Sequence, residues 1–182
     1  YLNFKNALEL GTSIGLATSS LAANKDLEVL TIEGCPETAR IAEEAFNNFD
    51  LTNIELKTGK FEEVLKNYHQ KIDLAYIDGN HSKEATLKNF ELLLKLKHNE
   101  SLFIFDDIYW SKEMQEAWQQ IKNHPEVTVT IDTFYWGLVF FRKESALKPH
   151  SSKETSQFSS MKTPSKDSLI IGSSSTIRTF LA

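Results

Sequence analysis

The sequence predicts an α/β fold: a doubly wound, Rossmann-like sheet of about seven strands, mostly parallel, with the last strand antiparallel. Short apolar segments alternate five times with amphipathic segments of helical period between residues 7 and 121. This alternation favours a parallel sheet covered by helices on both faces. The last two apolar segments are joined by a short connection, which indicates an antiparallel pair.

The first two strand–helix units carry the clearest signals. Strand 7–10 ends in the turn Gly11-Thr12-Ser13-Ile14-Gly15, and we expect a helix to begin near Ser13. Strand 27–32 ends at Glu33 and is followed by Pro36, a residue suited to the first turn of a helix. That helix should extend to Phe46, because apolar residues recur on one face up to that point.

The remaining elements follow in the same order. We expect strands at 54–57, 72–77 and 101–105, each followed by a helix, at 61–68, 85–96 and 114–121, and closing strands at 127–131 and 134–141. The 72–77 strand is apolar almost throughout, which is typical of a strand buried on both faces. We therefore expect one domain over residues 1–147. Residues 148–182 are rich in Ser, Thr and Lys and are expected to form a disordered low-complexity tail.

The composition limits the classes of protein to which this chain can belong. The net charge is −5, so no overall basic field argues for a nucleic-acid partner. No apolar run approaches the roughly 20 residues that a membrane span requires. The single cysteine, Cys35, allows no internal disulfide and fits a reducing compartment, so we expect a cytoplasmic protein. The chain begins at Tyr1, shortly before the first strand, and we expect upstream helices to be missing. A homodimer is compatible with the sequence, which leaves the oligomeric state open.

Acidic residues stand at the predicted carboxyl ends of the parallel strands, where open α/β sheets bind ligands. Glu33 follows the glycine turn by about 20 residues, and a carboxylate at that position can accept both hydroxyls of a ribose. Ser13 stands where the dinucleotide fingerprint has its second glycine, which favours an adenosyl ligand over NAD. An NAD-dependent oxidoreductase and a strand-to-helix turn without a ligand remain the alternatives.

A second acidic group follows two strands that should be neighbours. Asp78, Asp106 and Asp107 offer hard oxygen ligands suited to Mg²⁺. His81 lies three residues after Asp78, and its ordinary pKa of about 6.5 suits a general base. The alternatives are solvated strand ends or helix caps for the aspartates, with Ser111 also able to cap, and a packing role for the histidine.

Taken together, these residues resemble a class I S-adenosylmethionine-dependent methyltransferase, over roughly residues 2–143. The stretch from Glu9 to Gly15 is similar to the family's first motif, and Glu33 matches its ribose-binding acidic residue. The closing antiparallel strand also matches the family. The resemblance implies that the cofactor is held by Glu9, Gly11, Thr12, Ser13, Gly15, Glu33, Gly59 and Asp78. One departure is Lys60, at a position where many members contact the adenine.

Within this class, the chain resembles the metal-dependent O-methyltransferases that act on small molecules. Asp78, Asp106 and Asp107 match their metal ligands, and His81 stands where the catechol and caffeoyl-type members have a catalytic lysine. The resemblance implies methyl transfer to a hydroxyl of a small-molecule acceptor, with Mg²⁺ as the divalent metal and His81 and Asp78 as catalytic residues. An inactive cofactor-binding domain and a metal-independent methyltransferase remain open.

Overall fold

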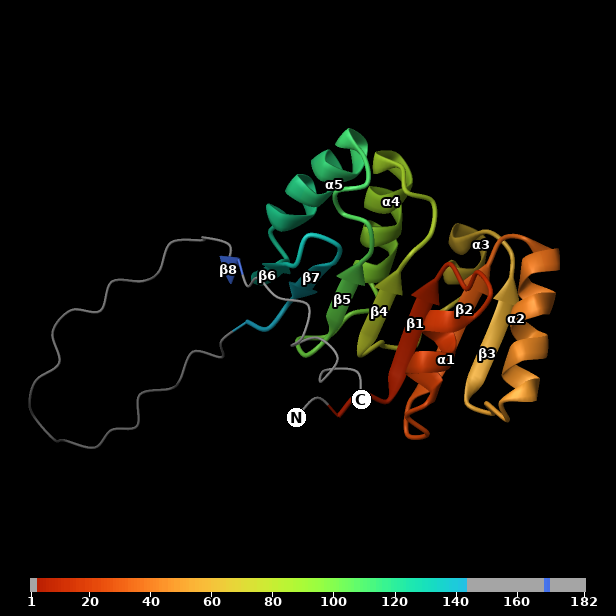
Figure 1. Cartoon of the computed structure of the whole chain (residues 1–182). Coiled ribbons are helices and arrows are strands. Elements are labelled where there is room, and N and C mark those ends of the chain that lie inside the picture. The colour runs from red at the N-terminus through yellow and green to blue at the C-terminus, as the bar shows by residue number, and fades with distance from the viewer. Residues whose placement is uncertain (1–2, 144–168, 171–182) are drawn as a thin grey trace, which may run out of the picture.

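A single mixed β-sheet organises the protein, seen in a computed structural model that describes residues 3–143 and 169–170 (Figure 1). The strands are β1 (Asn6–Leu10), β2 (Glu28–Glu33), β3 (Ile54–Thr58), β4 (Leu74–Ile77), β5 (Leu102–Phe105), β6 (Val129–Asp132), β7 (Gly137–Phe140) and β8 (Leu169–Ile170). Their order across the sheet is β3-β2-β1-β4-β5-β7-β6-β8. Strands β1 to β5 pair in parallel, and β7 is antiparallel to both of its neighbours. The predicted doubly wound sheet with a reversed closing strand is confirmed.

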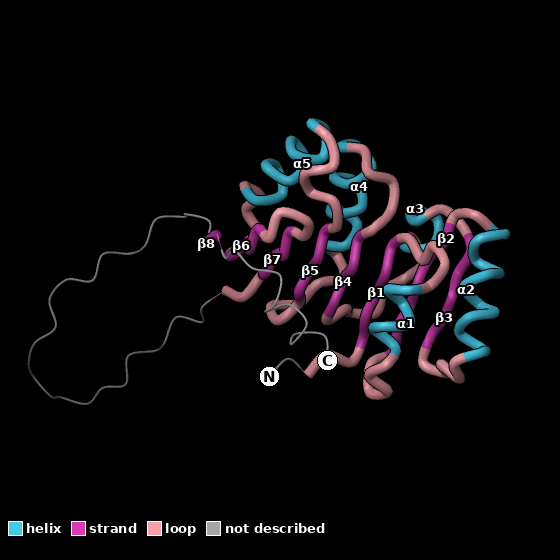
Figure 2. The backbone as a smooth tube through the Cα atoms, in the orientation of Figure 1, coloured by secondary structure: helices cyan, strands magenta, loops and turns pink. Residues whose placement is uncertain are grey.

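Helices pack on both faces of the sheet (Figure 2). They are α1 (Leu16–Ala22), α2 (Pro36–Asn48), α3 (Phe61–Leu65), α4 (Lys83–Leu94) and α5 (Lys112–Lys122). Alternate residues of each strand point to opposite faces. On one face Leu8 and Leu10 join a core with Phe90 of α4 and Trp118 of α5. On the other face Ala7 joins a smaller core that includes residues of α1.

Several boundaries differ from the sequence-based expectation by two or three residues, and two of these differences have a clear cause in the backbone. Helix α1 begins at Leu16 instead of near Ser13, because Ser13 and Gly15 both adopt positive φ, at 50° and 85°, and keep the turn out of helical geometry. The last strand is shorter than expected at its start. Phe134 has a φ of 74°, so the residues before Gly137 form a turn.

The predicted tail lies outside the described residues, apart from the two residues of β8. Leu169 and Ile170 pair in parallel with Ile131 and Asp132 of β6. Within the described part of the chain, no helix is long and apolar enough to cross a membrane.

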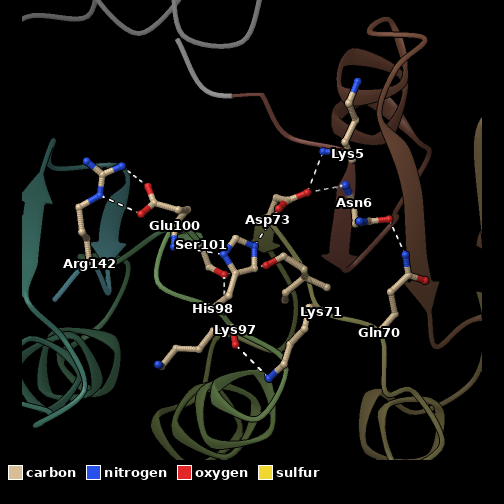
Figure 3. A network of polar contacts seen from close by, with 11 residues as sticks. Lys5, Asn6, Gln70, Lys71, Asp73, Lys97, His98, Glu100, Ser101 and Arg142 are labelled. Carbon is tan, nitrogen blue, oxygen red and sulfur yellow. Dashed lines mark hydrogen bonds and ion pairs between the residues drawn. The ribbon is translucent and has the colours of Figure 1, made fainter. Parts of the chain in front are cut away.

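At the amino end of the sheet, Asp73 fastens the start of β1 to the neighbouring strands (Figure 3). Its Oδ2 accepts the backbone N–H groups of Lys5 at 2.7 Å and Asn6 at 2.8 Å, and its Oδ1 lies 2.8 Å from His98 Nε2. Burial opposes the charge, but the two backbone donors and His98 outweigh it and hold the pKa of Asp73 below its ordinary value. The carboxylate therefore stabilises the fold in its ionised form.

Replacing Asp73 with alanine should lower the free energy of unfolding by about 1–3 kcal/mol at neutral pH, because two backbone donors lose their partner. The folded-state pKa is depressed, so this contribution is present above the unfolded value of 3.8 and is lost as the pH falls through the folded pKa. Urea unfolding at neutral and acidic pH should show the difference between the two proteins shrinking on acidification.

The matched control is Asp26→Ala. Asp26 also contacts Lys5, through an exposed ion pair with Lys5 Nζ at 3.3 Å. Such pairs contribute only about 0–1 kcal/mol. Equal costs for the two substitutions would contradict the role of Asp73.

Candidate functional site

A cavity of about 600 Å³ opens where β1 to β4 end at the carboxyl edge of the sheet. The turn after β1 and the end of β2 form one part of its wall, with Gly11, Ser13 and Glu33. The loop after β3 and the start of α3 form another part, and the loop after β4 and the first turns of α4 complete it. A doubly wound sheet is expected to bind its ligand at the carboxyl edge, and this chain has a cavity there.

Gly11 allows two strand ends to approach closely. Its φ is 105°, and a Cβ added there would lie 2.3 Å from the backbone oxygen of Asp78. Gly15 has a different role, because a Cβ there would lie 2.5 Å from the ring of Phe46 in α2. Gly11 lines the cavity, whereas Gly15 lets α2 pack against the turn.

Glu33, the last residue of β2, presents an immobilised carboxylate to the cavity. Its Oε2 accepts the backbone N–H of Ser13 at 2.9 Å, and its Oε1 accepts the backbone N–H of Cys35 at 2.9 Å. Each carboxylate oxygen has a further lone pair. The arrangement leaves both oxygens able to accept hydroxyl groups of a ligand.

Glu9 lies below the cavity and does not line it. Its side chain is fully buried, and its Oε2 accepts the hydroxyls of Thr18 and Thr31. Thr12 Oγ1 lies 2.6 Å from Thr31 Oγ1 and donates to it, since the Thr31 hydroxyl proton is directed to Glu9. Burial raises the pKa of Glu9 to about 7. Glu9 and Thr12 thus connect β1, β2 and α1 beneath the turn, and the structure does not bring them to the cavity wall.

The second acidic group gathers at the ends of β4 and β5. Ile77 pairs with Phe105, so Asp78 and Asp106 follow adjacent strand ends. His81 Nε2 lies 3.5 Å from Asp78 Oδ1 and 4.0 Å from Asp107 Oδ2. Burial, followed by the negative charge of Asp106, raises the pKa of Asp78 to about 6. The predicted metal ligands and the predicted base are therefore neighbours.

The donor set of this acidic group suits a hard cation, because carboxylates held close together gain from a positive charge between them. However, among residues 3–143 no three His, Cys, Asp or Glu side chains are already arranged to hold a metal. Asp106 is instead engaged by Tyr76, whose hydroxyl donates to Asp106 Oδ2 at 2.9 Å. Holding an ion would require these side chains to turn toward one another.

Aromatic residues follow Asp107 in the chain and do not line the cavity. Tyr109 stacks on Phe134, with ring centroids 5.3 Å apart, and donates its hydroxyl to Asp132 Oδ2 at 2.7 Å. Trp110 is 73% exposed. Tyr109 follows Asp107 closely in the sequence, whereas its neighbours Phe134 and Asp132 are brought to it only by the turn between β6 and β7.

Phe61 and Asn89 are two of the cavity-lining residues that sequence reasoning missed. One signal was available for Asn89. It is a polar residue four positions from both Ala85 and Leu93, on the apolar stripe of α4. Gly59, which was predicted, does line the cavity.

Comparison with known proteins agrees with the fold. A family model described as a methyltransferase domain matches residues 8–108. No curated protein matches the chain. Among solved structures, the O-methyltransferase from Bacillus cereus in complex with SAH has 22% identity and a TM-score of 0.64, covering 76% of this chain and 75% of that one.

Two further solved structures have the same fold. The SAH-bound methyltransferase PaMTH1 from Podospora anserina has 16% identity and a TM-score of 0.68, with 77% of this chain and 73% of that chain covered. The O-methyltransferase TomG from Streptomyces achromogenes, in complex with SAM, has 17% identity and a TM-score of 0.66, with 78% and 74% covered. The structural likeness establishes the fold, and the family match spans more than half of the sequence. The chain therefore belongs to the family of methyltransferase domains.

Proposed function

We propose that the protein transfers a methyl group from S-adenosylmethionine to a hydroxyl of a small molecule. The observation that carries the proposal is the Glu33 carboxylate, held by two backbone N–H groups at the wall of a cavity beside Gly11. This arrangement suits the two hydroxyls of a ribose next to a close-approach turn. The solved relatives that carry SAM or SAH have the same fold, which supports this choice of ligand.

We assign each part of the cofactor to a different part of the cavity wall. Its methionine part lies at the turn formed by Gly11 and Ser13, and its ribose lies at Glu33. Its adenine then extends toward Gly59 and Phe61, which line the remaining wall. Asp78 lines this cavity and also belongs to the acidic group, so the sulfonium end faces the predicted site of reaction.

In the proposed reaction, His81 accepts the proton of the acceptor hydroxyl at Nδ1, since Nε2 faces the carboxylates of Asp78 and Asp107. The acceptor oxygen forms a bond to the methyl carbon as the carbon–sulfur bond breaks, leaving a neutral thioether. Asp78, Asp106 and Asp107 would hold Mg²⁺, which when bound supplies Lewis-acid assistance to the acceptor oxygen. Asp78 and Asp107 also orient His81, because both carboxylates lie near its Nε2.

Calorimetric titration with S-adenosylhomocysteine and, separately, with NAD tests the choice of cofactor. We expect S-adenosylhomocysteine to bind and Glu33→Gln to weaken it by about tenfold or more, since charged acceptors form the stronger hydrogen bonds. Binding of NAD instead would overturn the proposal. Tight binding without turnover of catechol, phenol or aliphatic hydroxyl acceptors, with or without Mg²⁺, would indicate an inactive domain.

His81→Ala should lower kcat by about 10²–10⁴-fold and leave the affinity for S-adenosylhomocysteine unchanged, because proton transfer to a positioned base is lost. Turnover measured against pH checks the assignment. His69→Ala is the control, since His69 is exposed and precedes β4, at the opposite end of that strand from Asp78. A pH–rate profile that is the same with and without His81 would remove it as the base.

A further inference from the structure

Asn89 on α4 combines burial with an unpaired hydrogen-bonding group. Its residue surface is 5% exposed, yet it lines the cavity. Its Nδ2 is buried and, among the residues that the structure describes, finds no hydrogen-bond partner. Leaving such a group unpaired costs about 1–3 kcal/mol. Because the residue lines the cavity, rotation of its amide brings the nitrogen toward a ligand there, which then supplies the missing partner.

Asn53 shows what a structural asparagine does in this protein. Its Nδ2 donates to the backbone oxygens of Ala22 at 3.1 Å, Asn24 at 3.1 Å and Leu27 at 2.7 Å. That amide joins the loop before β3 to the loop after α1. Asn89 has no comparable bond from its amide nitrogen, so a purely structural role leaves its presence on the apolar stripe of α4 unexplained.

The surroundings of Asn89 suit a flat heterocycle with a polar edge. Phe61 lies against Gly79, where an added Cβ would be 2.7 Å from the Phe61 ring, and both residues line the cavity together with Ala85. These groups provide an apolar wall. Asn89 adds an amide, which offers both a donor and an acceptor and can exchange their positions by rotating the side chain.

Lys60 does not fill this role. It stands where the family resemblance places a residue in contact with adenine, but its side chain is 83% exposed and its Nζ lies 3.9 Å from Glu63 Oε1. Lys88, the neighbour of Asn89, is also engaged, by Glu62 at 2.6 Å across the gap between α3 and α4. The amide of Asn89 is thus a cavity-lining polar group that lacks a protein partner.

We infer that Asn89 recognises the adenine base of the cofactor by hydrogen bonding to its polar edge. The inference rests on the proposed binding of S-adenosylmethionine. Adenine carries ring-nitrogen acceptors and an amino donor, and an asparagine amide can match such a pair. Asn89 therefore acts as a specificity residue for the base. It provides the adenine contact that many family members make from the position of Lys60.

The substitution Asn89→Leu tests the inference. We expect the affinities for S-adenosylhomocysteine and for adenosine to fall by the same factor, about tenfold, because both ligands contain the base. The thermal midpoint of the free protein should stay the same or rise, since an unpaired buried polar group is replaced by an apolar one. Calorimetry and thermal unfolding measure the two effects.

Thr86→Val is the matched control. Thr86 is also a buried polar residue of α4, but its hydroxyl contacts Met114 Sδ at 3.3 Å and it does not line the cavity. We expect both affinities to remain at the wild-type value. An equal loss for Thr86→Val and Asn89→Leu would overturn the inference, because it would reflect general disturbance of α4.

A spectroscopic measurement on the wild-type protein decides the question even if the Asn89 variant folds poorly. The side-chain amide signal of Asn89 in a ¹⁵N-labelled sample should shift on addition of adenosine and not on addition of homocysteine. No shift with adenosine, or unchanged affinities in Asn89→Leu, would overturn the role of Asn89. Absence of any binding of S-adenosylhomocysteine to the wild type would instead overturn the proposed function.

Discussion

Gly11→Ala is expected to reduce the affinity for S-adenosylhomocysteine by at least about 100-fold and to lower the free energy of unfolding by about 2–4 kcal/mol. A Cβ at this position would lie 2.3 Å from the backbone oxygen of Asp78, and the φ of 105° is unfavourable for alanine. The ends of β1 and β4 must move apart to accept the methyl group. That movement displaces the turn that faces the cofactor, so stability and binding fall together.

Gly34→Ala provides the matched control for this prediction. Gly34 also lines the cavity, but a Cβ added there meets no atom within 4 Å. The free energy of unfolding should stay within about 0.5 kcal/mol of the wild type. Urea unfolding and calorimetry on both variants separate the effects. If Gly11→Ala were as stable as Gly34→Ala, the close backbone contact at Gly11 would not restrict the turn, and the prediction would be wrong.

Asp107→Ala should lower metal-dependent turnover by at least about 100-fold, because the proposed metal site would lose one ligand and with it several kcal/mol of charge stabilisation. Asp107 does not line the cofactor cavity, so binding of S-adenosylhomocysteine should be unaffected. Asp107→Asn should retain most activity, since an amide oxygen is also a suitable ligand for a hard cation. Turnover with Mg²⁺ and with EDTA checks both variants.

Binding of Mn²⁺, followed by its electron paramagnetic resonance signal, provides a measurement that does not depend on the acceptor. Mn²⁺ should bind the wild type and Asp107→Asn and should bind Asp107→Ala weakly. Asp107 has a φ of 52°, a conformation that is unfavourable for alanine, so Asp107→Ala should also lose some folding stability. All assays should therefore be run at a temperature at which each protein is folded. Wild-type turnover that persists in EDTA would contradict the metal role.

Much of the fold could be predicted because it follows from local patterns. Apolar segments with alternating faces, and helices with apolar stripes, mark β1 to β5 and α2 to α5 directly in the sequence. The start of α1 could not be predicted, because Ser13 adopts positive φ only through its place in the turn, where its N–H is bound by Glu33. The shortened β7 has a similar cause in the positive φ of Phe134.

Position at a strand end was enough to predict that Gly11, Glu33 and Asp78 would share one edge of the sheet, and all three line the cavity there. The site was less predictable where a side chain could point either into the cavity or into the protein interior. Glu9 ends up beneath the sheet edge because Thr18 and Thr31 provide hydroxyl donors there. That pairing joins residues from three different elements, and no local pattern indicates it.

The strand order also determines when this chain can complete its fold during translation. The ribosome delivers β6 before β7, yet β6 is joined to the rest of the sheet only through β7, which inserts between β5 and β6. Until Phe141 has emerged and packed on Phe103, at a ring distance of 4.7 Å, the edge of β5 stays open. An open, apolar strand edge invites intermolecular pairing. A nascent chain halted before Gly137 would therefore leave this edge open to intermolecular pairing.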